Sequence, residues 1–119
     1  MEMILIVGFL LTAASVFHAF RSAEEDGSDP LREALDGGAL VLDVRTVFEF
    51  HAGHVDGAVN IPVEDLEARL AELGATSRAI VVYSRTGAMS RSAAVILRQA
   101  GYRVVDAGPM SALAGRSAS

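Results

Sequence analysis

Short apolar runs alternate with amphipathic segments along the middle of this chain, and that alternation limits its possible folds more than any other feature. Residues 39–44 (ALVLDV), 79–83 (AIVVY) and 102–105 (YRVV) fit strands, and the first two are apolar enough for burial on both faces of a sheet. Between and before them, residues 30–36, 63–73 and 90–100 fit helices. Strands alternating with helices predict an α/β fold with a mainly parallel sheet flanked by helices.

Local signals predict where several elements begin and end. Asp29 followed by Pro30 suits a helix start, and the Thr46-x-x-Glu49 capping box predicts a short helix over residues 47–51. Leucines 66, 70 and 73 share one face of the expected 63–73 helix, which Gly74 ends. We expect a brief extended segment at residues 58–61 and one helical turn at residues 110–113.

The N-terminal residues 3–20 (MILIVGFLLTAASVFHAF) carry no Asp, Glu, Lys or Arg. As a helix they would measure about 27 Å, close to the ~30 Å hydrocarbon core of a bilayer. We therefore expect residues 1–22 to form a membrane anchor. A cleaved signal peptide and a buried core helix are the alternatives; against the signal peptide, Glu2 stands where Lys or Arg is usual.

The charges near the apolar segment predict its orientation in a membrane. Arg21 and Arg32 follow the segment and nothing basic precedes it, which places a single-pass protein's domain in the cytoplasm. A cleaved signal peptide would instead give a periplasmic or secreted protein. We expect residues 23–29 to be an acidic linker, residues 30–114 the folded domain and residues 115–119 a disordered tail.

Composition excludes several classes of function. The 119 residues suffice for one domain, and none of them is Cys, which removes disulfides, thiolate metal sites and thiol nucleophiles together. Ten basic residues against fifteen acidic ones argue against a sequence-independent nucleic-acid binder. The three His residues have no second ligand cluster near them, so we expect no metal and no other cofactor.

Residues 84–90 (SRTGAMS) join a predicted buried strand to a predicted helix. Backbone N–H groups in such a loop can surround an anion, and the helix start adds partial positive charge. Gly87 permits a turn with positive φ, and two arginines supply charge. The candidate binding residues are therefore Ser84, Arg85, Thr86, Gly87, Ala88, Met89, Ser90 and Arg91. An ordinary strand-to-helix turn with solvated arginines is the alternative.

Two motifs in this sequence resemble those of the rhodanese family. Residues 43–45 (DVR), 49–50 (EF) and 53–62 (GHVDGAVNIP) match its first signature. Residues 81–87 (VVYSRTG), followed by Gly101-Tyr102, match its active-loop region in wording and length. The resemblance covers about residues 31–108 and is closest to small single-domain bacterial rhodaneses. It implies a parallel sheet of about five strands flanked by helices.

The same resemblance implies that this chain departs from the family where the chemistry occurs. A Cys begins the family's active loop and carries a persulfide on its thiolate, and Ser84 stands at that position. A serine hydroxyl cannot carry transferable sulfane sulfur, because it is far less acidic than a thiol and forms no S–S bond. Met89 stands where the family often has a basic residue.

Four further residues are expected to support the loop. Asp43 and Arg45 resemble a structural pair that braces the neighbouring loop through an ion pair or hydrogen bonds. Glu49 belongs to the capping box, and His54 resembles a loop-bracing histidine more than a general base.

Together these observations predict a membrane-tethered rhodanese-like module without sulfurtransferase activity, which binds a small oxyanion, a sulfur compound or a protein partner. An enzymatic alternative is a residual sulfurtransferase, or a hydrolase in which Ser84 is the nucleophile and His54 the base. A third alternative is a scaffold whose loop stays empty.

Overall fold

A computed structural model describes residues 29–115 of the chain. The predicted anchor at residues 3–20 and most of the predicted linker and tail lie outside these residues. Within residues 29–115, no helix is both long enough and apolar enough to cross a membrane.

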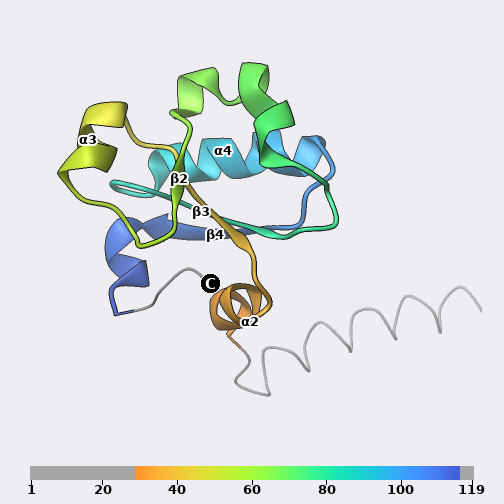
Figure 1. Cartoon of the computed structure of the whole chain (residues 1–119), viewed down its shortest axis with the longest axis horizontal. Helices are drawn as coiled ribbons and strands as arrows, with labels where there is room; N and C mark the ends of the chain where they lie inside the picture. The colour runs from red at the N-terminus through yellow and green to blue at the C-terminus, as the bar shows by residue number, and fades with distance from the viewer. Residues whose placement is uncertain (1–28, 116–119) are drawn as a thin grey trace, which may run out of the picture.

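The described chain forms an α/β fold around one parallel sheet (Figure 1). Its strands are arranged in the order β2-β1-β3-β4, and every neighbouring pair is parallel. The strands are β1 (Leu40–Asp43), β2 (Val59–Asn60), β3 (Ile80–Ser84) and β4 (Val104–Pro109). The α-helices are α2 (Pro30–Asp36), α3 (Val47–Ala52) and α4 (Ala88–Gln99), and the 3-10 helices are η1 (Val63–Asp65), η2 (Glu67–Leu73) and η3 (Met110–Leu113).

Alternate residues of the central strands face opposite layers of the core. Leu42 of β1 and Val82 of β3 pack with α4 and the η1–η2 segment, whereas Val41 and Val81 pack with α2 and η3. Figure 1 shows these two layers on opposite sides of the sheet. Both faces are therefore covered, which explains why β1 and β3 are continuously apolar rather than alternating.

The predicted α/β class, parallel sheet and flanking helices are confirmed, but the expected number of strands is wrong. We expected about five strands, and residues 29–115 form four. The expected extended segment at residues 58–61 contributes only the two residues of β2. No further run of strand-forming residues remains among the described residues to supply a fifth strand.

The predicted α-helix over residues 63–73 is also wrong. The segment folds instead as η1 and η2, held by i→i+3 bonds such as Leu66 N to Val63 O at 3.2 Å. Arg69 has non-helical backbone angles (φ −116°, ψ 17°), which breaks the α-helical path. The leucine pattern reports the buried face correctly, since Leu66 and Leu73 are buried, but it does not distinguish a 3-10 from an α-helical path.

Signals at the helix ends have the expected structural effect. The Asp29 side chain accepts hydrogen bonds from the first turn of α2. Thr46 and Glu49 form the complete capping box of α3, with Glu49 N donating to Thr46 Oγ1 at 3.1 Å and Thr46 N donating to Glu49 Oε1 at 3.3 Å. Helix α4 begins at Ala88, two residues earlier than the sequence predicts, so the last three residues of the 84–90 segment belong to its first turn.

Candidate functional site

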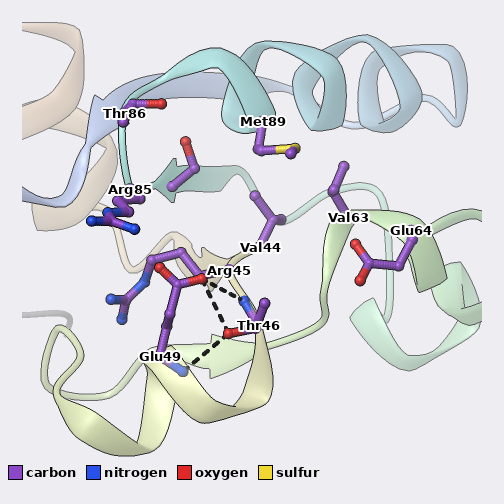
Figure 2. A pocket seen from close by; sticks show the side chains of 10 residues that line it. Val44, Arg45, Thr46, Glu49, Val63, Glu64, Arg85, Thr86 and Met89 are labelled. Carbon is purple, nitrogen blue, oxygen red and sulfur yellow. Dashed lines mark hydrogen bonds between the residues drawn. The ribbon is translucent and has the colours of Figure 1, made fainter.

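A cavity of about 210 Å³ opens where the carboxyl ends of β1 and β3 lie side by side. This is the edge of a parallel sheet at which ligands usually bind. The lining comes from three segments: the end of β1 with the start of α3, the residues after β2, and the loop between β3 and α4 (Figure 2). The lining residues are Val44, Arg45, Thr46, Glu49, Val63, Glu64, Ser84, Arg85, Thr86 and Met89.

The hydroxyl of Ser84 organises the loop between β3 and α4. Ser84 is fully buried, and its Oγ accepts hydrogen bonds from Gly87 N at 3.0 Å and Ser90 N at 3.1 Å. Gly87 has a φ of 100°, a left-handed conformation that favours glycine, and it lets the chain turn back over Ser84. The Ser90 hydroxyl donates to Gly87 O at 3.0 Å, which holds the turn against α4.

These contacts favour an electron-rich side-chain atom at residue 84. Two amide donors converge on residue 84 and the start of α4 adds partial positive charge, so negative charge on the side-chain atom there would be stabilised. In the present chain a neutral hydroxyl oxygen takes both bonds. The loop therefore holds its shape through its own side chain.

The structure gives no support to a base at Ser84. Within residues 29–115, both hydrogen-bond partners of Ser84 Oγ are amide donors, and neither can accept its proton. His54 Nδ1 lies 2.8 Å from Phe50 O, and the His54 ring stacks on Phe50 with centroids 3.7 Å apart. His54 lines a different cavity, formed with η3. Within residues 29–115, Ser84 Oγ thus has no hydrogen-bonded base of the kind that activates a serine nucleophile.

A buried ion pair fixes the segment that forms one wall of the cavity. Asp43 is fully buried and the Arg45 side chain is 8% exposed; Arg45 Nη2 lies 2.7 Å from Asp43 Oδ2. The same Nη2 donates to Gly53 O at 2.6 Å, and the Tyr83 hydroxyl donates to Asp43 Oδ2 at 2.6 Å. These bonds connect β1, β3 and the loop after α3, so the residues following Asp43 are held rigidly beside the cavity.

The pKa values of Tyr83 and Arg45 are both raised, the first mainly by burial and the second mainly by contact with Asp43. Burial, together with the hydrogen bond to Asp43, raises the pKa of Tyr83 to about 12. The hydrogen bonds to Asp43 raise the pKa of Arg45 above its ordinary value. Arg45 is therefore a permanent cation whose charge is already matched by Asp43.

The raised pKa of Tyr83 predicts a loss of stability at alkaline pH. Above pH ~10 the unfolded chain loses the phenolic proton, whereas the folded chain keeps it up to about 12. The folded state therefore becomes less stable as the pH rises across that window, by up to ~2 kcal/mol. The Tyr83→Phe variant has no phenolic proton to lose. The free energy of unfolding of the unmodified chain should therefore exceed that of Tyr83→Phe by less at pH 11 than at pH 8. Urea unfolding at both values measures it, and an unchanged difference would contradict the prediction.

Among the residues that the structure describes, no group of three or more His, Cys, Asp or Glu side chains is arranged to hold a metal ion.

Comparison with known protein families matches residues 28–108 to the rhodanese-like domain. The chain belongs to the rhodanese-like family. A rhodanese from E. coli, solved with anions, is 33% identical and superposes with a TM-score of 0.58 over 64% of this chain and 92% of that one.

The curated relatives of this rhodanese-like domain include sulfurtransferases and longer proteins. A sulfurtransferase of Allochromatium vinosum is 35% identical over 53% of this chain, and the HTH-type transcriptional regulator Rv0324 of Mycobacterium tuberculosis is 43% identical over 62%. The matches span only 58% and 33% of those proteins' lengths.

The cavity of this rhodanese-like domain contains some of the sequence-predicted residues and not others. The cavity is lined by four of the predicted binding residues, Ser84, Arg85, Thr86 and Met89. It is also lined by Arg45 and Glu49, which the sequence predicts as structural support. The remaining loop residues that were predicted to bind a ligand do not line the cavity; they are Gly87, Ala88, Ser90 and Arg91. Gly87 and Ser90 instead shape the loop through their contacts with Ser84.

One wall of the cavity is formed by Val63 and Glu64, which are not among the residues predicted from the sequence to bind a ligand. These residues follow the carboxyl end of β2, next to Pro62. The signal was available, because residues just after any strand of a parallel sheet lie at the ligand-binding edge. It was overlooked because the segment reads as the first turn of an amphipathic helix.

Proposed function

We propose that this chain is a rhodanese-like module that binds a small ligand at its 84–90 loop and does not itself transfer sulfur. The observation that carries the proposal is the position of Ser84. Its side-chain atom lies between two amide donors at the start of α4, the environment that would activate a thiolate, yet the sequence contains no cysteine. An alcohol at that position cannot accept and release a sulfane sulfur atom.

Several findings support a retained binding role. The cavity beside the loop is open, its wall is fixed by the Asp43–Arg45 pair, and the related E. coli rhodanese was solved with anions. The hydrolase alternative has no such support, because Ser84 Oγ has amide donors and no base as its partners among the described residues.

A sulfurtransferase assay tests the proposal. With thiosulfate as sulfur donor and cyanide as acceptor, we expect the unmodified chain to form thiocyanate no faster than the Ser84→Ala variant. Both should match the uncatalysed background. A rate above that of Ser84→Ala, proportional to protein concentration, would refute the claim that the chain is inactive in sulfur transfer.

We also propose, from the sequence alone, that residues 3–20 attach the domain to a membrane with the domain in the cytoplasm. The support is the length of the uncharged segment. After alkaline carbonate extraction the chain should remain in the membrane pellet, and release into the supernatant would argue against an anchor.

A further inference from the structure

The charged side chains around the cavity point to the class of ligand that it takes. Its lining includes two arginines and two glutamates, so their formal charges cancel. Arg45 is already neutralised by Asp43, and Glu49 Oε1 accepts hydrogen bonds from Thr46. An inorganic dianion would therefore meet little net positive side-chain charge.

Two opposite charges at the cavity have no protein partner in the described part of the chain. Arg85 and Glu64 are both exposed, and neither forms an ion pair or a side-chain hydrogen bond within residues 29–115. Figure 2 shows them on opposite sides of Val44, Val63 and Met89, with the Glu64 carboxylate directed toward these apolar side chains and the exposed Arg85 guanidinium directed away from them. The cavity thus has a cation at one rim, an anion at the other and apolar groups in the middle.

We propose that the cavity binds a small zwitterion: its anionic group lies at the 84–90 loop beside Arg85, its cationic group lies at Glu64, and a short apolar chain joins the two. This inference rests on the proposed function, since it assumes that the loop binds a ligand. At about 210 Å³ the cavity is smaller than the ~300–1,000 Å³ typical of drug-sized ligands, which suits a molecule of this kind.

A matched pair of sulfonates tests the proposal. Homotaurine is a sulfonate with a terminal ammonium group, and butanesulfonate has the same number of non-hydrogen atoms with a methyl group in its place. Each is titrated at low salt into the ¹⁵N-labelled full chain, and binding is followed by the amide shifts of residues 84–90. Because one exposed charge pair contributes modestly, we expect homotaurine to bind about threefold to fivefold tighter than butanesulfonate.

Two substitutions test whether Glu64 is responsible for the preference for homotaurine. Glu64→Gln should abolish the preference for homotaurine and leave butanesulfonate binding equal or stronger. Glu67→Gln is the matched control, because Glu67 is an exposed glutamate of the neighbouring η2 that does not line the cavity. It should leave the preference unchanged.

The outcomes separate this inference from the proposed function. If butanesulfonate shifts the loop amides but homotaurine binds no tighter, or if Glu64→Gln keeps the preference, the zwitterion proposal is wrong and ligand binding at the loop stands. If neither sulfonate and no thiosulfate shifts the loop amides, the ligand-binding function fails as well.

Discussion

The Ser84→Cys variant is expected to show sulfurtransferase activity, which we propose the unmodified chain lacks. A sulfur atom at residue 84 would lie where Gly87 N and Ser90 N converge at the start of α4. Those donors stabilise a thiolate, so the pKa of the new thiol should fall from ~8.5 to below about 7.5. The thiolate would then displace sulfite from thiosulfate, forming a persulfide whose outer sulfur cyanide removes as thiocyanate. We expect thiocyanate formation at least about tenfold above Ser84→Ala.

Because the sequence contains no cysteine, the thiol introduced at residue 84 is the only one in the protein, and the observed thiol chemistry can be assigned to it. Its pKa can be measured from the ultraviolet absorbance of the thiolate as the pH is raised. Ser92→Cys is the control: Ser92 is exposed on α4, and the thiol introduced there should titrate near ~8.5 and transfer no sulfur. A Ser84→Cys thiol that titrates like Ser92→Cys would show that the loop does not stabilise an anion.

Replacing Asp43 by Asn is expected to lower the free energy of unfolding strongly. The change removes the carboxylate that neutralises Arg45, whose side chain is 8% exposed and has no other acidic partner among the described residues. Breaking one partner of a buried ion pair costs about 3–5 kcal/mol, because the remaining charge stays buried without compensation. A domain of this size has a total stability of only about 5–15 kcal/mol, so the variant should be largely unfolded at elevated temperature.

Urea unfolding followed by circular dichroism measures this effect. Glu72→Gln is the matched control, because it breaks the Arg69–Glu72 pair, whose side chains are 37% and 54% exposed. That exposed pair should contribute less than ~1 kcal/mol. If Asp43→Asn lowered the free energy of unfolding no more than Glu72→Gln, the buried pair would not be the element that fixes the cavity wall.

Much of the fold follows from short-range patterns in the sequence. The apolar runs at β1 and β3 predict buried parallel strands, and the Thr46–Glu49 capping box predicts α3 almost to its last residue. These predictions succeed because burial on two faces and helix capping depend on residues close together in the chain. The path of residues 63–73 depends instead on how the segment packs against α4, and the leucine spacing carries no information about that packing.

The site shows the same division. The role of Gly87 follows from local backbone geometry and could be predicted. The position of Val63 and Glu64 after β2 places them at the ligand-binding edge, but their place in the same cavity as Ser84 depends on a strand order that brings β2 beside β1. The double hydrogen bond to Ser84 Oγ is local in sequence, but it accompanies a start of α4 two residues earlier than the sequence suggests. The lining of the cavity therefore depends both on local backbone geometry and on contacts between segments distant in sequence.

The most direct test of the account is whether the unmodified chain retains sulfur. The full chain is incubated with thiosulfate, freed of excess reagent and analysed by intact mass spectrometry, with Ser84→Cys as the positive control. We predict an unchanged mass for the unmodified chain and the addition of one cyanide-labile sulfur atom to Ser84→Cys. One sulfur atom held by the unmodified chain and released by cyanide would contradict the account.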